Sequence, residues 1–291
     1  MTVVLISSSE DPASTNIKNS LFTLTPWEES GSFYDAPVYK NLKMKNIVLL
    51  TIPDKKILHE NIDIEIHDQL HLEPKIAIFL SRHRSKMGEP TLTVHPIGNY
   101  GDAEFGGKPR TLVPALPRMM AHLLRLIKKN LQVTMLEYKV CYEVTHHGPF
   151  LQVPTLFAEV GSTEVQWQQP EPALVIANSL CELLSYKSDE NEYSNDIPVL
   201  LGIGGGHYAP RFTDVAFQRN AAFGHMIASY HIDAGIIDWP MIEQSIQATP
   251  HFSGVYLHRK ALKKSQITEY RHLLEHHNIP VLSSEDLPSF S

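Results

Sequence analysis

The stretch IPVLLGIGGGHYAP (residues 197–210) joins a short apolar run to a cluster of glycines, a histidine and a proline. The apolar run is typical of a buried β-strand, and Pro210 suits the first turn of a following helix. Glycines between the two allow either a tight turn or the close approach of a ligand to bare backbone. The stretch therefore predicts one β–α unit, with His207 just beyond the carboxyl end of its strand.

Similar apolar runs recur along the chain. The predicted strands are 2–7, 46–53, 75–83, 139–147, 155–162, 197–205, 254–258 and 279–284. Helical spacing of apolar positions occurs at 113–130, 164–185, 210–223, 240–248 and 262–277. Repeated β–α alternation favours a three-layer α/β fold, in which a mostly parallel twisted sheet carries helices on both faces.

Length and composition favour a single α/β domain over residues 1–291. Hydrophobic residues make up 43% and charged residues 20% of the chain, which is ordinary for a globular protein with a sizeable core. The segment 84–112 is rich in proline and glycine and is predicted to be a long irregular insertion, a kind of loop that is often functional. The charged segment 185–196 is predicted to be a solvated loop.

Composition also limits the compartment and the partners. No apolar stretch approaches the roughly 18 to 20 residues that cross a bilayer, and the N-terminus lacks the pattern of a signal peptide. Cys141 and Cys181 form no CxxC pair, which favours reduced thiols and a cytoplasmic protein without a membrane partner. The formal charge of −7 argues against non-specific coating of nucleic acid. We expect a monomer.

Histidine is the residue type that stands out, with 16 in 291 residues. Pairs or single histidines follow predicted strands at Arg82–His83, His146–His147 and His207, and His95 and Asn99 lie in the segment after His83. Ligands of open parallel sheets bind outside the carboxyl ends of the strands. Any one of these histidines could be structural, but the agreement of three strand ends favours a common site.

Two carboxylates accompany these histidines. Glu143 and Glu159 lie in apolar strands, where a buried carboxylate needs a partner such as a histidine or a metal. Alternation along 139–147 predicts that Glu143 and His146 point to opposite faces of the sheet. Imidazole and carboxylate are zinc ligands, and a catalytic zinc keeps one position for water. The pattern therefore predicts a site in which a histidine or a metal such as zinc serves as the partner of the carboxylates.

Basic residues are unevenly distributed. Six of them, and no acidic residue, lie between 108 and 130: Lys108, Arg110, Arg118, Arg125, Lys128 and Lys129. The segment HRKALKK (258–264) adds four more. These residues form either an ordinary solvated surface or a track for phosphates. The glycines at 204–206 resemble a phosphate cradle, but the P-loop and dinucleotide fingerprints are both absent.

Four motifs resemble those of the archaeal and plant-type D-aminoacyl-tRNA deacylases. They are SRHRSKMGEPTLTVHPIGNYGDAEFGGKP (81–109), VCYEVTHHGPFLQVPTLFAEVGSTEVQW (140–167), LGIGGGHYAPRFT (201–213) and AFGH (222–225). The resemblance implies hydrolysis of the ester that joins a D-amino acid to the terminal ribose of tRNA. It also implies zinc, and a core like those of peptidyl-tRNA hydrolases and phosphorylases. MIASY after AFGH, and LHRKAL near 257, depart from the family pattern and leave the role of the C-terminal segment open.

The resemblance and the residue pattern together give candidate roles for the site. We expect His83, His147, His207 and Glu143 to be catalytic. We expect His95, His146, Glu159 and His225 to bind metal. We expect Arg82, Asn99, Gly204, Gly205, Gly206, Tyr208, Lys128 and Lys129 to contact a tRNA charged with a D-amino acid, with the glycine amides receiving the oxyanion or a phosphate.

Three alternatives stay open at this point. A zinc-dependent amidohydrolase or nucleoside-type hydrolase acting on small molecules would use the same histidines without the basic surface. A non-catalytic tRNA-binding or nucleotide-binding protein would not need them. Within the deacylase hypothesis, a metal-free reaction assisted by the ribose hydroxyl is possible. Selection for the D-amino acid is expected to come from pocket walls that exclude an L side chain.

Overall fold

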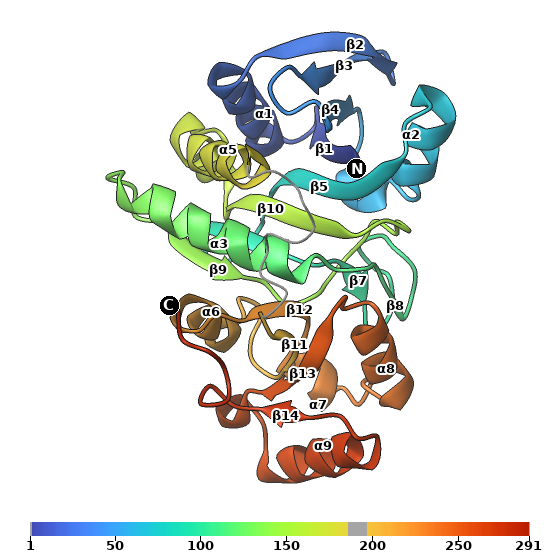
Figure 1. The fold of residues 1–291 in the computed structure, drawn as a ribbon, viewed down its shortest axis with the longest axis vertical. Coiled ribbons are helices and arrows are strands. Elements are labelled where there is room, and N and C mark those ends of the chain that lie inside the picture. The colour runs from blue at the N-terminus through green and yellow to red at the C-terminus, as the bar shows by residue number, and fades with distance from the viewer. Residues whose placement is uncertain (1, 186–196, 291) are drawn as a thin grey trace.

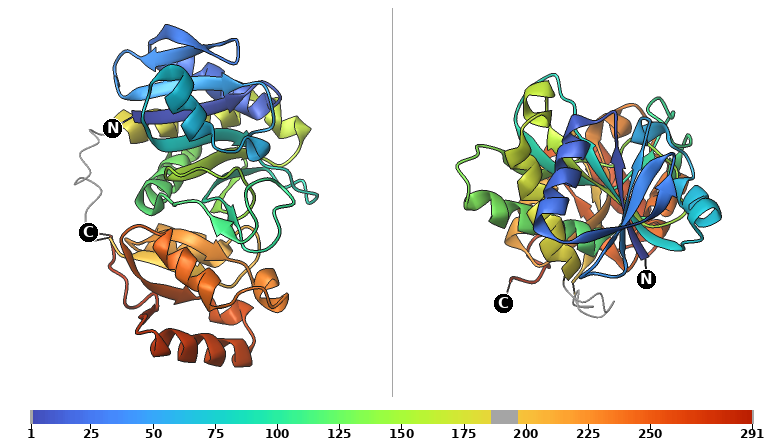
Figure 2. Two further views of the ribbon diagram at one scale, coloured as in Figure 1. Left: turned by 90° about the vertical axis from the view of Figure 1, so that its right-hand side faces the viewer. Right: turned by 90° about the horizontal axis from the view of Figure 1, so that it is seen from above.

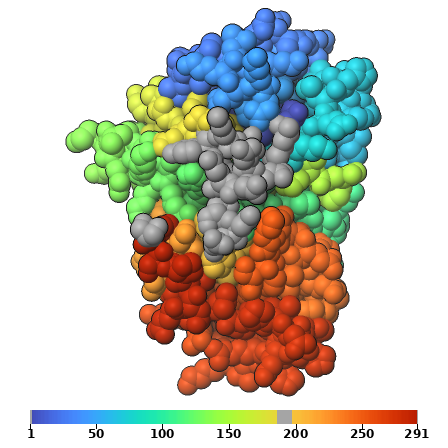
Figure 3. Space-filling model, in the orientation of Figure 1, coloured from blue at the N-terminus to red at the C-terminus, as the bar shows by residue number. Residues whose placement is uncertain are grey.

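The computed structural model describes residues 2–185 and 197–290, and the predicted loop 185–196 lies almost entirely outside this range. Two β-sheets lie one above the other along the long axis of the molecule (Figure 1). The side view shows the same stacking (Figure 2), and in the space-filling view the C-terminal residues form the lower part of the molecule (Figure 3).

The first sheet has the strand order β2-β3-β4-β1-β5-β10-β6-β9. Its strands are β1 (Thr2–Ser8), β2 (Trp27–Phe33), β3 (Ala36–Asn41), β4 (Ile47–Ile52), β5 (Pro74–Arg82), β6 (Thr91–His95), β9 (Lys139–Tyr142) and β10 (Thr155–Gly161). The central strands β4, β1, β5 and β10 are parallel to one another. β3 and β6 pair with this group in the antiparallel sense, and β9 is parallel to β6.

Helices cover both faces of the first sheet. The helices are α1 (Pro12–Leu24), α2 (Ile62–Leu70), α3 (Pro117–Gln132), α4 (Glu164–Trp167) and α5 (Pro170–Ser185). Alternate residues of β1 separate the two layers: Val3 and Leu5 pack with residues of α1, α3 and α5, whereas Val4 and Ile6 pack with residues of α2. The pleat of a strand that is buried on both faces explains this division.

The second sheet has the order β12-β11-β13-β14, and all of its strands are parallel. Its elements are β11 (Val199–Ile203), α6 (Pro210–Gln218), β12 (Ala222–Ile227), α7 (Ser229–Asp233), α8 (Trp239–Gln247), β13 (Phe252–Leu257), the 3₁₀ turn η2 (Arg259–Ala261), α9 (Lys264–His276) and β14 (Val281–Leu282). Leu200 packs toward α6, whereas Leu201 and Ile203 pack toward α8 and α9. The predicted three-layer α/β arrangement is therefore confirmed.

Several boundaries differ from the sequence-based expectation. The strand predicted at 139–147 ends at Tyr142, and the helix predicted at 210–223 ends at Gln218 and is followed by β12. The segment 84–112 contains β6 and the short pair β7 (Gly98–Asn99) and β8 (Thr111–Leu112), so it is not irregular throughout. The single domain over 1–291 stays a prediction. Among the described residues, no helix has the length and apolar character needed to span a membrane.

Candidate active site

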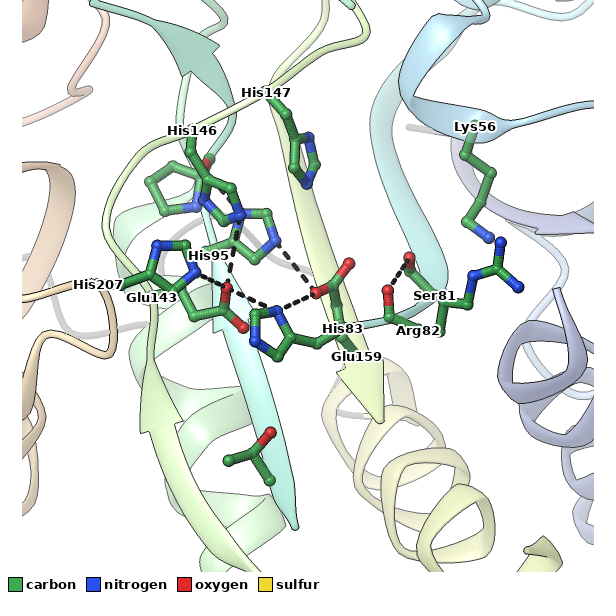
Figure 4. Close-up of polar contacts among 12 residues, drawn as sticks. Lys56, Ser81, Arg82, His83, His95, Glu143, His146, His147, Glu159 and His207 are labelled. Carbon is green, nitrogen blue, oxygen red and sulfur yellow. Dashed lines mark hydrogen bonds and ion pairs between the residues drawn. The ribbon is translucent and has the colours of Figure 1, made fainter. Parts of the chain in front are cut away.

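Histidines and carboxylates project from one face of the first sheet (Figure 4). In the sheet register Glu159 lies opposite Ser81 on β5 and opposite Thr93 on β6. Side chains two residues apart share a face. The pleat therefore places His83 and His95 on the same face as Glu159, and Glu159 Oε2 lies 3.6 Å from a ring nitrogen of each.

The neighbouring strand β9 adds the second carboxylate. Cys141 is paired with Thr93, so Glu143, two residues farther on, lies on that same face. The chain leaves the sheet direction after Tyr142, and His146 Nε2 returns to within 3.4 Å of Glu143 Oε2. The prediction that Glu143 and His146 face opposite ways is therefore wrong, because it assumed a strand that continues to residue 147.

The second sheet contributes His207. This residue follows β11, and its Nε2 lies 2.8 Å from Glu143 Oε2. The backbone fixes the contact as well, because Val144 N–H donates to the His207 carbonyl at 2.9 Å. Two segments that are 64 residues apart in sequence thus meet between the two sheets.

The carboxylates at the centre are shielded from water and bonded to imidazoles. Glu143 and Glu159 side chains are 0% and 3% exposed. Burial alone would raise the pKa of Glu143, but hydrogen bonds with His207 and His83 hold it well below its usual range. Burial would also raise the pKa of Glu159, but the neighbouring His83 and His95 imidazoles, each 3.6 Å away, lower it instead. Both groups are therefore carboxylates at neutral pH.

The imidazoles divide into two kinds. Burial would lower the pKa of His83, but Glu143 and Glu159 outweigh it and raise that pKa, so His83 is protonated at neutral pH. Burial and the positive charge of His95 lower the pKa of His146 and His147, which are therefore neutral. A neutral imidazole is the form that binds metal or accepts a proton.

Three histidines are oriented alike by backbone carbonyls. Nδ1 of His95 lies 3.1 Å from the Pro96 carbonyl, Nδ1 of His146 lies 2.8 Å from the Val144 carbonyl, and Nδ1 of His147 lies 2.6 Å from the Gly148 carbonyl. A carbonyl oxygen only accepts, so each Nδ1 carries the hydrogen. The Nε2 atoms of the neutral His146 and His147 then offer lone pairs, and His95 Nε2 does so when that ring is deprotonated. This is the arrangement usual for metal-binding histidines.

The donor set around these histidines fits a cation. Ring nitrogens of His95, His146 and His147 lie within 4.8 Å of one another, and the same holds for ligand atoms of His95, Glu143 and Glu159. His95 Nε2 and Glu143 Oε1 are buried and have no hydrogen-bond partner among the described residues. An unpartnered buried polar atom is costly, and a zinc ion accepts nitrogen and carboxylate ligands of this kind. Glu159 also raises the pKa of His95, although burial opposes this. A proton and a metal ion would therefore compete for the same nitrogen.

His225 does not join this cluster, which corrects its assignment as a metal ligand. It is fully buried, its Nε2 donates to the Val113 carbonyl at 3.0 Å, and its Nδ1 lies 3.1 Å from Thr145 Oγ1. Both ring nitrogens are therefore used within the protein. His147 instead lies with His95 and His146, so the expected catalytic histidine is placed among the possible ligands.

Several residues expected to contact substrate have structural partners. Asn99 Nδ2 donates to the carbonyls of Gly106 and Lys108, which braces the loop between β7 and β8. The N–H of Gly204 donates to the Ile227 carbonyl, and the N–H of Gly205 donates to Ser229 Oγ. These two amides are therefore not available to an oxyanion.

The expected phosphate track at 108–130 is also largely engaged within the protein. Lys129 pairs with Glu182 at 2.5 Å, and Lys128 Nζ lies 3.9 Å from the centre of the Phe217 ring. Arg110 pairs with Asp238, and Arg125 donates to three backbone carbonyls. These contacts favour the ordinary structural role over a row of phosphate ligands.

Tyr208 lies at the edge of the cluster, whereas the side chain of Arg82 points away from it, on the side of Lys56 (Figure 4). The Tyr208 hydroxyl is 3.0 Å from His83 Nε2, which links it through His83 to Glu143. The Arg82 guanidinium lies 5.0 Å from the centre of the Trp167 ring.

The sequence reasoning missed a buried ion pair beside these residues. Lys56 Nζ contacts Asp11 Oδ2 at 2.5 Å, and both side chains are almost fully buried. Asp11 also accepts the N–H of Arg82 at 2.9 Å and caps α1 through Ser14 N–H. Both residues follow strands of the parallel group (Figure 4 labels Lys56), so the rule applied to the histidines would have found them.

The fold and the cluster together define an α/β protein with a candidate active site of imidazoles and carboxylates between two sheets. The sequence model of the D-aminoacyl-tRNA deacylases matches residues 70–282. The D-aminoacyl-tRNA deacylase of Pyrococcus abyssi is 39% identical over 229 residues, 78% of this chain and 80% of the relative. That of Methanosarcina barkeri is 33% identical over 292 residues, 98% of this chain and 90% of the relative.

The chain belongs to the D-aminoacyl-tRNA deacylase family. The same fold occurs in a crystal structure described as "Conserved Protein of Unknown Function AF0625", with a TM-score of 0.87 and 27% identity over 99% of both chains. The resemblance drawn from the four sequence motifs is thereby confirmed.

Proposed function

We propose that this chain hydrolyses the ester between a D-amino acid and the terminal ribose of tRNA, releasing the free D-amino acid and the tRNA. Family membership gives the reaction class, and the observation that carries the proposal is the bond between Glu143 and His207. A buried carboxylate bonded to a partly exposed imidazole is a suitable proton carrier for ester hydrolysis. An aminoacyl ester is already activated, so placement and proton transfer supply most of what is needed.

His207 is the imidazole that we assign to proton transfer. Its side chain is 35% exposed, whereas those of His83 and His95 are 6% and 0% exposed. When Nε2–H of His207 donates to Glu143, Nδ1 accepts the proton of the attacking water. The water oxygen then bonds to the ester carbon, the bond to the ribose oxygen breaks, and His207 returns the proton to that oxygen. Glu143 stabilises the imidazolium in between.

We further propose that zinc is held by His95, His146 and His147, with Glu159 or Glu143 able to complete the set. Bound zinc would polarise the water or the ester carbonyl. The protein residues position the reactants around it. His83 balances the two carboxylates with its positive charge, and the Tyr208 hydroxyl fixes His83 from the other side.

The proposal also covers selectivity for the D-amino acid, the oligomeric state and the compartment. Pocket walls that exclude an L side chain would give selectivity for the D-amino acid. We expect a monomer in the cytoplasm, where charged tRNA is used. The small-molecule hydrolase is the less favoured alternative, because the family matched over residues 70–282 is named for aminoacyl-tRNA.

Deacylation of matched D-tyrosyl-tRNA and L-tyrosyl-tRNA tests the proposal. We expect the D-ester to be cleaved at least about 100-fold faster, a difference of roughly 2.7 kcal/mol in transition-state binding. Equal rates for the two esters would contradict chiral selection. Absence of hydrolysis of either ester would contradict the proposed function. Repeating the assay after dialysis against a chelator tests zinc separately. Full activity of a demonstrably metal-free protein would exclude zinc from the reaction.

A further inference from the structure

A cavity lies at the carboxyl edge of the second sheet, outside the histidine cluster. Its volume is about 540 Å³, and its walls come from the ends of β13 and β14 and the start of α6. Connections leave β11 toward β12 and β13 toward β14, in opposite directions across the sheet. Ligands of open α/β sheets bind where the strand order reverses in this way. A cavity of this size accommodates a nucleotide-sized group.

The inner wall of this cavity presents a fixed guanidinium. Arg211 Nε donates to the Tyr256 hydroxyl at 2.9 Å, and Arg211 Nη2 donates to Ser284 Oγ at 2.9 Å. Tyr256 and Ser284 are themselves 2.9 Å apart. Neutral hydroxyls therefore hold the side chain in place without cancelling its charge. A guanidinium fixed in this way is well suited to phosphate.

Further positive charge surrounds Arg211. Arg259 and Lys260 line the same cavity from exposed positions, and within residues 2–185 and 197–290 none of these three cations forms an ion pair. Two carboxylates, Asp214 and Glu285, also line the cavity, and both are exposed. The lining as a whole therefore carries one net positive charge, and Arg211 is its least exposed charged group.

The positive charges at this wall also affect the pKa of His258. Burial lowers its pKa, and the charges of Arg211 and Lys260 lower it further. Its Nδ1 is buried and has no hydrogen-bond partner among the described residues.

The glycine loop after β11 separates this cavity from the histidine cluster. On one side of the loop His207 contacts Glu143 at 2.8 Å. On the other side a Cβ at Gly205 would lie 3.1 Å from His258 Nδ1. The cavity and His207 therefore lie on the two sides of one short loop.

We propose that this cavity, lined by Arg211, His258, Arg259 and Lys260, binds a backbone phosphate of the RNA strand that ends in the scissile ester. The inference rests on the proposed function, because that function supplies the RNA. It assigns tRNA binding to Arg211 and to residues 258–260, within the stretch LHRKAL (257–262) that departs from the family pattern, and not to the residues 108–130.

The test compares the double variant Arg259→Ala/Lys260→Ala with Lys264→Ala/Arg271→Ala, which removes the same charge from exposed positions of α9 outside the cavity. The Kd for uncharged tRNA is measured against salt concentration by fluorescence anisotropy. We expect the cavity variant to bind about 10-fold more weakly, with a log–log salt slope smaller by about one. The α9 variant should keep the slope of the unaltered protein.

Two further measurements distinguish the sources of phosphate and separate this inference from the proposed function. In the unaltered protein, inorganic phosphate should compete with tRNA, and Arg211→Gln should weaken that competition. For hydrolysis, the rise in KM of the cavity variant should be several-fold larger for D-tyrosyl-tRNA than for D-tyrosyl-adenosine, which has no phosphate.

If the salt dependence of the Kd for tRNA is unchanged in the cavity variant, the inference is wrong. If that variant loses phosphate binding but keeps tRNA binding, the cavity binds a small phosphorylated molecule instead. If neither ester is hydrolysed but the tRNA slope still falls, the cavity assignment stands and the proposed function fails.

Discussion

Glu143 contacts imidazoles from three separate parts of the chain, at 2.8 Å to His207, 3.1 Å to His83 and 3.4 Å to His146. Its other oxygen has no hydrogen-bond partner among the described residues. One carboxylate thus joins the proton carrier to the possible metal ligands.

Zinc content distinguishes the two kinds of buried histidine. His146→Asn removes a free Nε2, and we expect bound zinc to fall at least 10-fold, since ligands and their partners control affinity at this level or more. His225→Asn should retain zinc while the free energy of unfolding falls by about 1–3 kcal/mol, because buried hydrogen bonds are lost. Metal analysis of both purified variants gives the answer. Zinc lost equally from both would contradict the assignment.

The Lys56–Asp11 pair makes a prediction about stability. Lys56→Met leaves the Asp11 carboxylate buried without its cation, so we expect the free energy of unfolding to fall by about 3–5 kcal/mol. Adding Asp11→Asn should restore much of the loss, because a neutral amide needs no counter-charge. Urea unfolding of the single and double variants measures this. If the double variant were less stable than Lys56→Met, charge balance would not be the explanation.

At the scale of elements, regular strands were predicted better than the turns and loops after them. Apolar runs such as 155–162 and 197–205 were located correctly, because strands buried on both faces are nearly continuous in hydrophobic residues. α1 and β2 were missed, since polar residues dominate their exposed faces. The gathering of histidines was predicted, but the direction of His146 was not, because it depends on the chain leaving β9 at Tyr142.

The backbone conformation of the loop after β11 can be tested by comparing substitutions at Gly205 and Gly206. Gly205 has φ of +103°, and a Cβ there would press on His258, whereas a Cβ at Gly206 would meet no atom within 4 Å. Gly205→Ala should lower the free energy of unfolding by about 1–3 kcal/mol and reduce kcat by moving His207. Gly206→Ala should change stability by less than about 0.5 kcal/mol. Equal effects of the two, by urea unfolding and deacylation, would show that the loop does not need this conformation.

At the scale of the whole molecule, the site exists only because two sheets are held in register. Val144 and Thr145 N–H groups donate to carbonyls of His207 and Met226, and α3 packs along β12. No local pattern in the sequence predicts this contact, because it joins segments far apart in the chain. The family resemblance supplied the reaction, whereas the structure supplied the placement of His147 and the exclusion of His225.

Arg125 on α3 forms hydrogen bonds with the end of α6 and with the segment between α6 and β12 of the second sheet. Its guanidinium donates to the carbonyls of Ala216, Arg219 and Ala221. Arg125→Met should lower the free energy of unfolding by about 2–4 kcal/mol and reduce activity, because three acceptors lose a charged donor. Lys128→Met, on the same helix, should cost less than about 1 kcal/mol. Thermal unfolding and deacylation are measured for the Arg125→Met and Lys128→Met variants. A stable, fully active Arg125→Met protein would show that these hydrogen bonds do not hold α3 against the second sheet.

The most direct test of the account is single-turnover deacylation of D-tyrosyl-tRNA by Glu143→Gln, compared with Glu137→Gln at an exposed position before β9. The amide keeps the shape but cannot stabilise a protonated His207, so we expect the rate to fall by about 10²- to 10⁴-fold while tRNA binding is kept. The Glu137 variant should match the unaltered protein. A Glu143→Gln protein that cleaves D-tyrosyl-tRNA at the normal rate would contradict the assignment of this cluster as the active site.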